Sequence, residues 1–307
     1  MLSIILKRLA LLPLMMLIVA TIGFILVKAA PGSAFTDDKA VSPEVMGKAK
    51  AYYGFDQPLH VQYGKYLTNL LQGDLGPCLK LKAYTVNEII AESAPVSLEL
   101  GVYAILIALL IGIPLGIIAA INHNKWQDYS AMTLAMAGIC LPAFVLAPGL
   151  LFIFSIHLGW FNPLGWETPS DRVLPSLSIG LYIAASIARL TRTGMLDVMN
   201  QDFIRTAKAK GLSTWPIIYK HALKGALLPV VNYLGPALAS VMAGSFVVET
   251  IFSIPGIGRH FVNAAFNRDE YLVLGSVIFF SFLLIMMNLV VDVIQLAIDP
   301  RSRKSKS

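Results

Sequence analysis

Residues 100–124 read LGVYAILIALLIGIPLGIIAAINHN and contain no charged side chain. A helix of about 20 apolar residues crosses the hydrocarbon layer of a bilayer, which is about 30 Å thick. The composition agrees with this, since 56% of the chain is hydrophobic and only 14% is charged. An ordinary soluble domain has about 25% charged residues. The stretch therefore predicts an all-α integral membrane protein.

Five further uncharged runs accompany this stretch, and the first of them, residues 9–27, lies between Arg8 and Lys28. That run is longer than the apolar core of a signal peptide, and no small-residue cleavage site follows it. A retained anchor is therefore favoured over a cleaved leader. The predicted spans, six in all, are an N-terminal helix within 1–29 and helices at about 100–121, 130–156, 173–193, 228–249 and 271–295.

The basic residues indicate the orientation, because Lys and Arg concentrate in short cytoplasmic loops. With Lys7 and Arg8 inside, six spans return the C-terminal tail, residues 300–307, to the same side. The net charge of +6 is a topology signal, since no stacking aromatics are interleaved with the basic residues to suggest nucleic acid. The connection between the fourth and fifth spans is then cytoplasmic and basic, with Arg189, Arg192, Arg205, Lys208, Lys210, Lys220 and Lys224.

Residues 30–96 form a long predicted extracytoplasmic loop. Val61, Tyr63, Tyr66 and Leu70 fall near helical spacing within it. A small helical segment on the outer face is predicted, with a solvated linker as the alternative. Aromatic and apolar residues are too frequent here for disorder.

Catalytic and metal-binding patterns are absent from the sequence. It contains no GxxxxGK[ST] phosphate loop and no GxSxG elbow. Cys78 and Cys140 are expected at different depths, and the five histidines show no metal-ligand spacing. Glu249 and Asp292 lie near predicted span ends where water reaches them, so an intramembrane protease or proton relay is not indicated. We therefore expect neither enzyme activity nor a bound cofactor or metal on this chain.

The cytoplasmic connection, about 196–227, is the most informative segment. Residues 202–210 predict a short amphipathic helix, and Gly211 permits a turn at its end. A second short helix follows before Leu228-Pro229 begins the next span, where proline suits the first helical turn. The pattern predicts a helix–turn–helix finger that can press into a groove of a separate protein. An ordinary basic cytoplasmic loop is the alternative.

This connection resembles the cytoplasmic EAA loop of ATP-binding-cassette importer permeases. Arg205-Thr206-Ala207 stands at the E-A-A positions, Gly211 at the glycine, and His221-Ala222-Leu223-Lys224 at I-x-L-P. The departures, Arg for Glu, His for Ile and Lys for Pro, are similar to the variant form of the peptide-importer branch. Further pieces resemble the B-subunit family of oligopeptide and dipeptide permeases: LKRLALLPLMMLIVATIGFILVKAAPGSAF, PEVMGKAKAYYGFDQP, YLTNLLQGDLGP, GSFVVETIFSIPGIGRHFVNAAFNRD and NLVVDVIQLAIDP.

The resemblance implies the type I importer permease fold in a bacterial inner membrane, with its core over 97–299 and both termini cytoplasmic. It also implies a second, C-type permease subunit, one or two cytoplasmic ATPase subunits that use ATP and Mg, and an extracytoplasmic peptide-binding protein. The expected site residues are Phe203, Arg205, Thr206, Ala207, Gly211 and Leu223 for ATPase coupling, and Pro255, Gly256 and Gly258 for a turn at the outer mouth.

Several alternatives stay open. Arg205 could instead neutralise lipid headgroups, and a plain connecting turn explains Pro255-Gly256 equally well. The resemblance implies an oligopeptide cargo, but a dipeptide, a cell-wall peptide, glutathione or a nickel chelate would use the same architecture. An ion-coupled secondary transporter is the alternative class, although Pro114, Pro142 and Pro148, which could break helices, have no charge beside them.

Overall fold

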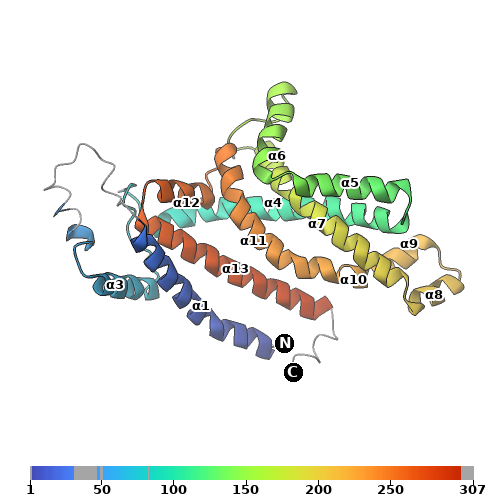
Figure 1. Ribbon diagram of the computed structural model, residues 1–307, viewed down its shortest axis with the longest axis horizontal. Coiled ribbons are helices and arrows are strands. Elements are labelled where there is room, and N and C mark those ends of the chain that lie inside the picture. Colours follow the sequence, from blue (N-terminus) through green and yellow to red (C-terminus); the bar gives the residue numbers. More distant parts are fainter. Residues whose placement is uncertain (1, 31–46, 49–50, 82, 299–307) are drawn as a thin grey trace. The chain divides into compact units, whose positions relative to one another are not determined.

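The computed structural model describes residues 2–30, 47–48, 51–81 and 83–298. The regular structure of this part is helical, and its extended pairing is one bridge between Pro77 and Thr85. The chain divides into two compact units (Figure 1). The first unit comprises the described parts of Met1–Leu6, Ser97–Pro255 and Met286–Ser307, and the second those of Lys7–Val96 and Gly256–Ile285.

The first unit is organised around α7 (Val173–Met199), which has buried residues along its whole length. The helices α5, α6, α10 and α11 contact it. This unit also contains the second part of α4 (Val86–Ile121), α5 (Trp126–Cys140) and α11 (Leu228–Ile251). Its shorter elements are α6 (Ala143–Leu150) with its π-helical extension η1 (Leu151–His157), and the 3₁₀ turn η2 (Pro169–Arg172).

Small residues let α4 and α7 pack at backbone distance. A Cβ atom added at Gly112 would lie 2.6 Å from the carbonyl oxygen of Ala184, and one at Gly116 would lie 2.5 Å from that of Ala188. Such small residues at four-residue spacing allow close helix contact within a membrane. The two glycines thus allow the backbone of α4 to pack directly against the backbone of α7.

The span predicted at about 130–156 is not one straight helix, so that prediction was wrong. The pair Trp126–Gly138 and Ala143–His157 bends by 98°. Pro142 disfavours the helical conformation at the residue before it, and Leu141 accordingly has φ −94° and ψ 107°. The proline therefore places the break.

The second unit joins α1 (Leu2–Ala29) from Lys7 onward, α3 (Leu59–Leu71), the start of α4, α12 (Ile257–Phe266) and the first part of α13 (Glu270–Ile298). The ring of Phe24 on α1 stacks on that of Tyr66 on α3, with centroids 5.8 Å apart. Leu274 and Ile278 of α13 complete this buried cluster. The α3 segment of the predicted outer loop is therefore a packed helix, and not a solvated linker. Residues 31–46, 49–50 and 82 of that loop lie outside the described part of the chain.

Four helices of the described chain are long and apolar enough to cross a membrane, or five if the bent pair forms one span. They are Ala10–Ala29, Val86–Ile121, Pro169–Met199 and Glu270–Ile294. In α11 the apolar helix found is the shorter Leu228–Leu238. The total of six spans and the side on which each terminus lies therefore stay predictions, and the tail 300–307 is outside the described residues.

Glu249 is fully buried near the end of α11, so the prediction that water reaches this carboxyl group was wrong. It accepts a hydrogen bond of 2.7 Å from the Ser97 hydroxyl on α4. The chain folds back directly after the helix, and the Ile254 N–H donates to the carbonyl oxygen of Glu249 at 2.8 Å. This return of the backbone and the α4 contact enclose the helix end.

Two ion pairs hold the ends of α7. At the N-terminal end Arg172 Nε lies 2.6 Å from Glu99 Oε1. At the C-terminal end the guanidinium of Arg192 donates to both oxygens of Asp128, at 2.6 and 2.7 Å. The Asp128 side chain is 2% exposed, so this pair is largely removed from water.

Cys78 is buried in the second unit, where its thiol donates to Asp269 Oδ2 at 2.9 Å. Burial and the neighbouring carboxylate raise the pKa of Cys78 to about 11. The thiolate is the nucleophile, so we expect Cys78 to resist iodoacetamide at neutral pH and to react only as the pH approaches the raised pKa. Mass spectrometry of the labelled chain measures this. Asp269→Asn should shift labelling to lower pH, and rapid labelling of the folded chain at pH 7 would contradict the prediction.

Candidate functional site

The basic connection after α7 forms two helical arms, which we call the finger, residues 202–226. The first arm is α8 (Asp202–Ala209). The second arm runs through α9 (Thr214–Pro216), η3 (Ile217–Ala222) and α10 (Leu223–Ala226). Figure 1 shows α8 and α9 near the C-terminal end of α7, and α10 beside that helix.

The finger has an apolar core of its own. Ile204 of α8 and Ile218 of η3 are fully buried, and their cluster includes Met195 of α7 and Ala120 of α4. Burying one such side chain contributes roughly 1.5–3 kcal/mol. The finger is therefore a packed extension of the first unit, which argues against an ordinary basic loop.

A glycine contact seats the second arm on α7. A Cβ atom added at Gly194 would lie 2.3 Å from the carbonyl oxygen of Ala226, closer than any real contact allows. One added at Gly225 would lie 3.3 Å from the Val198 side chain. The backbones of α7 and α10 can approach this closely only because position 194 carries no side chain.

Gly211 separates the two arms. Its φ is +78°, a left-handed conformation that glycine adopts at low cost and that commonly ends helices. Its N–H donates to the carbonyl oxygen of Lys208 at 3.0 Å. A Cβ here would meet nothing within 4 Å. Glycine is therefore needed at this position for its backbone conformation, because a side chain would have enough space there.

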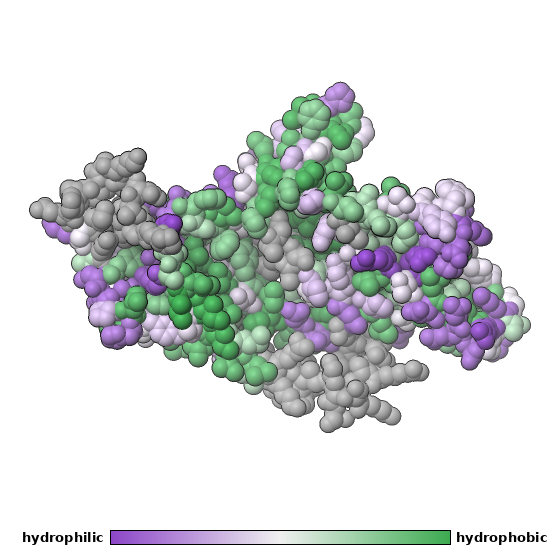
Figure 2. Space-filling model, in the orientation of Figure 1, coloured by the Kyte–Doolittle hydropathy of each residue, from purple (hydrophilic) through white to green (hydrophobic). Residues whose placement is uncertain are grey.

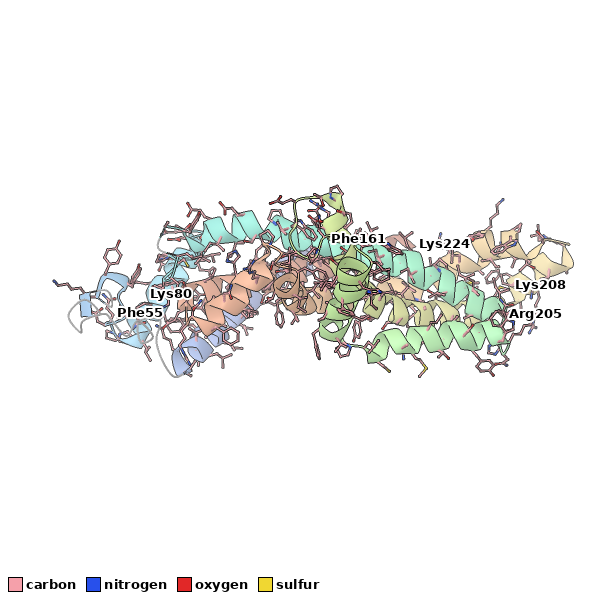
Figure 3. All side chains as sticks on the ribbon, turned by 90° about the horizontal axis from the view of Figure 1, so that it is seen from above. Phe55, Lys80, Phe161, Arg205, Lys208 and Lys224 are labelled. Carbon is pink, nitrogen blue, oxygen red and sulfur yellow. The ribbon has the colours of Figure 1, made fainter. Side chains whose placement is uncertain are left out.

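Three predicted coupling residues lie on the outer side of α8. The Phe203 side chain is 46% exposed. Arg205 Nη1 lies 3.4 Å from Asp202 Oδ1, and the Thr206 hydroxyl donates to the Asp202 carbonyl oxygen at 3.0 Å. An exposed ion pair contributes at most about 1 kcal/mol, so Arg205 can exchange Asp202 for another anion. Figure 3 places Arg205 and Lys208 together at the finger, where Figure 2 shows hydrophilic surface.

Ala207 and Leu223 lie inward. Ala207 is buried, and Leu223 packs partly buried against the same core cluster. The coupling role predicted for Ala207 therefore stays a prediction, and its side chain packs within the finger. In the structure both residues hold the two arms together.

The sequence interpretation missed an exposed aromatic pair on the second arm. The rings of Trp215 and Tyr219 stack with centroids 5.8 Å apart and planes 16° apart. Each side chain is 60% exposed. Their i, i+4 spacing was the available signal. Trp and Tyr are enriched in the centres of protein interfaces, so this pair belongs with Phe203 among the contact candidates.

The residues predicted as an outer-mouth turn do not share one turn. The chain turns at residues 252–253, with Ser253 at φ +54°, and residues 254–256 then lead without regular structure to α12. Gly256 is the N-cap of α12, whereas Gly258 is buried within the first turn of that helix. Pro255 precedes the cap, so the turn ends earlier than predicted because α12 begins at Ile257. A place at the outer mouth stays a prediction.

Within the part of the chain that the structure describes, no three His, Cys, Asp or Glu side chains are grouped so that they could hold a metal ion. The charged groups of the finger are chiefly Lys and Arg, which do not serve as metal ligands.

Known proteins resemble this chain along almost its whole length. The family described as "Binding-protein-dependent transport system inner membrane component" matches residues 112–304, and the corresponding N-terminal family matches residues 1–100. The oligopeptide transport system permease protein OppB of Haemophilus influenzae is 46% identical over 288 residues, which cover 93% of this chain and 94% of that protein. The dipeptide transport system permease protein DppB of Bacillus subtilis is 43% identical over 290 residues, 94% of each chain.

A solved structure supports the fold. A chain of the MetNI methionine ABC transporter in an inward-facing conformation aligns with a TM-score of 0.57 and 17% identity. The alignment covers 69% of this chain and 96% of that one. At this identity the likeness bears on the fold alone, and it agrees with the helical permease fold that the resemblance implied.

Proposed function

Because the chain belongs to the family of binding-protein-dependent transport system inner membrane components, we propose that it is a permease subunit of an ATP-driven oligopeptide importer. In this role it forms half of the translocation pathway through the inner membrane. The observation that carries the proposal is the 46% identity to an oligopeptide permease over 93% of the chain. The folded basic finger between α7 and α11 supports coupling to a separate ATPase.

The proposed topology has six spans, with both termini and the finger on the cytoplasmic side. The four or five apolar helices account for most of these spans. Basic residues gathered in the finger support its cytoplasmic placement. In this arrangement the N-terminal helix within 1–29 and the segment 30–96 precede a permease core over 97–299.

Coupling is proposed to run through the exposed side of α8. Phe203 would enter an apolar groove of the ATPase, while Arg205 and Thr206 would contact its polar rim. Ala207, Gly211 and Leu223 would keep the two arms in one shape, so that movement of the ATPase reaches α7 and is not lost in a flexible loop. ATP and Mg belong to the ATPase, since the sequence contains no phosphate loop.

Three partners complete the proposed assembly. A second, C-type permease subunit supplies the other half of the pathway. One or two ATPase subunits bind the fingers, and an extracytoplasmic binding protein delivers the peptide. The alternative cargoes, a dipeptide, a cell-wall peptide, glutathione or a nickel chelate, would use the same assembly.

Uptake by the reconstituted complex tests the function. Proteoliposomes containing the four kinds of subunit are supplied with labelled peptides, from dipeptide to octapeptide, and with glutathione and a nickel chelate. We expect uptake of peptides longer than a dipeptide, dependent on the binding protein and on ATP at the finger side. Uptake of another cargo in the series would reassign the substrate. Uptake that persists without ATP and follows an ion gradient would overturn the importer class.

Phe203→Ala is expected to reduce ATP-driven uptake by about tenfold or more, because truncating an interface anchor typically costs about 2 kcal/mol or more. The amount of ATPase that co-purifies in mild detergent should fall with it. Phe266→Ala is the matched control, since Phe266 lies on α12 of the second unit and is 80% exposed. Equal uptake by the two variants would argue against contact through Phe203.

A further inference from the structure

The second unit has a cavity of about 230 Å³ that is open at the surface and that the proposed transport roles do not use. It lies at the end of α1, the end of α12 and the start of α13. A cavity of about 150 Å³ takes up benzene, so this one accepts about nine non-hydrogen atoms, as in a short hydrocarbon segment. Four aliphatic and two charged side chains form most of its wall: Leu26, Val27, Ala265, Val273, Arg268 and Glu270.

The cavity lies where two apolar helices end. Val27 is near the end of the candidate span Ala10–Ala29, and Val273 is in the first turn of the candidate span Glu270–Ile294. The helices α1 and α13 pack on each other in one buried cluster. Figure 2 shows hydrophobic surface along α1. The ends of such spans lie where the hydrocarbon layer meets the lipid headgroups.

One positive charge of the wall lacks a counter-ion. The carboxylate of Glu270 is already paired, since Lys28 Nζ lies 2.5 Å from Glu270 Oε2. Among the described residues, the Arg268 guanidinium makes neither an ion pair nor a hydrogen bond. Its nitrogen atoms are not enclosed by the protein, so a ligand can reach them. A guanidinium is always charged and offers five N–H donors.

Arg268 also occupies a backbone position where glycine is usual. Its φ is +54°, and it directly follows Asn267, the C-cap of α12. The Arg268 N–H donates to the Ala265 carbonyl oxygen at 3.4 Å. The Asp269 N–H donates to the Ala264 carbonyl oxygen at 2.9 Å. This is the Schellman arrangement, whose left-handed residue is commonly glycine. Other residues held in this conformation cluster at functional sites, so the arginine here points to a use for its side chain.

The turn that carries Arg268 is fixed by its neighbour. Asp269 is 1% exposed, and its Oδ2 accepts from the N–H groups of Leu79 and Lys80 at 2.7 and 3.1 Å. Its Oδ1 accepts from the Leu272 N–H at 3.2 Å. The carboxylate of Asp269 is thus engaged inside the second unit. The guanidinium of Arg268 is therefore presented at the cavity from a well-anchored backbone.

We propose that this cavity binds an anionic phospholipid. The lipid phosphate accepts hydrogen bonds from the Arg268 guanidinium, whose planar geometry suits a phosphate group. One acyl chain lies against Leu26, Val27 and Val273. The aliphatic wall and the place at two span ends favour a lipid over a soluble anion. The single unpaired positive charge favours a headgroup of net negative charge over a zwitterionic one.

Photo-crosslinking of the full-length chain in phosphatidylcholine nanodiscs tests the proposal. The probes are traces of phosphatidylglycerol and of phosphatidylcholine, each with a diazirine in one acyl chain. Mass spectrometry of the digested chain counts crosslinks to the cavity wall, residues 26–30 and 265–273. We expect phosphatidylglycerol to crosslink there at least about fivefold more than phosphatidylcholine. Equal crosslinking by the two probes would mean ordinary lipid contact and would overturn the proposal.

Unlabelled competitors separate a lipid from a soluble anion. Added phosphatidylglycerol should remove the crosslinks to the cavity wall. Glycerophosphoglycerol, the same headgroup without acyl chains, should leave them in place at the same molar amount. Equal competition by the two compounds would show a soluble-anion site, and the lipid assignment would then be wrong.

Arg268→Gln and Lys65→Gln form a matched pair, because each removes one positive charge from the second unit. Lys65 is exposed on α3 and is not part of this wall. Arg268→Gln should lower phosphatidylglycerol crosslinking to the level of phosphatidylcholine, and Lys65→Gln should leave it unchanged.

Arg268→Gly separates loss of the site from loss of folding. It removes the same charge, but glycine adopts a φ of +54° at low cost, so this variant should melt at the wild-type temperature or above. Its crosslinking should fall as in Arg268→Gln. Crosslinking at the wild-type level in both Arg268 variants would refute the role of this side chain.

Discussion

Gly194→Ala is expected to reduce ATP-driven uptake by about tenfold or more and to destabilise the chain by about 1–3 kcal/mol, as overpacking typically does. The added methyl group would lie 2.3 Å from the Ala226 carbonyl oxygen. Because that atom belongs to the backbone of α10, the second arm must move away from α7. Uptake in proteoliposomes and thermal unfolding of the purified chain measure the two effects.

Gly149→Ala is the matched control for this substitution. Gly149 also lies in a helix of the first unit, but a Cβ atom there would meet nothing within 4 Å. Alanine favours a helix over glycine by up to about 1 kcal/mol, so this variant should be as stable as the wild type or more so. If the two variants have the same uptake and the same stability, Gly194 is not required for packing the finger against α7.

Asp128→Asn is expected to destabilise the chain by about 3 kcal/mol, at the lower end of what breaking a buried ion pair costs. The Asp128 side chain is 2% exposed and that of Arg192 is 24% exposed. The substitution leaves the guanidinium partly buried without its counter-charge and places an amide group against two N–H donors. Unfolding of the purified chain in mild detergent measures the loss.

Asp202→Asn provides the comparison, because Asp202 also pairs with an arginine. Its partner Arg205 lies 3.4 Å away, and the two side chains are 95% and 73% exposed. A pair so exposed contributes at most about 1 kcal/mol. Equal losses in stability for Asp128→Asn and Asp202→Asn would show that burial does not determine how much each ion pair stabilises the chain.

The ion pair of α7 also shows where sequence reasoning ends. Asp128 and Arg192 are 64 residues apart, and the sequence analysis interpreted Arg192 only as one of the basic residues of a cytoplasmic connection. Their attraction depends on α5 and α7 lying side by side, which no local pattern expresses. The same holds for Gly194, whose neighbour Ala226 lies beyond the whole finger.

The break between α5 and α6 was visible in principle. Pro142 stands within the long uncharged run from Tyr129 to Trp166, and the prediction placed one helix across it. Hydropathy indicates how apolar a segment is, but it does not indicate whether the helix axis changes direction within that segment. The residue before a proline disfavours helical geometry, and that local rule, given more weight, would have placed the bend.

The sequence could not predict which residues of the finger are buried, and the reason is a different one. The predicted coupling set contained residues of both kinds, with Phe203 exposed and Ala207 buried. A short amphipathic helix has one apolar face, and the sequence cannot say whether that face meets its own chain or a partner. In the structure Ala207 is buried in a cluster that also contains Met195 and Ala120.

The sequence by itself determined the membrane class and the family, because apolar length and ordered motifs are properties of short segments read independently. It also located the finger and the glycine that turns it. Only the tertiary structure decided which residues of the finger face outward and which glycine seats the finger on α7. These depend on contacts between segments far apart in the chain, and such contacts form only once the helices have packed.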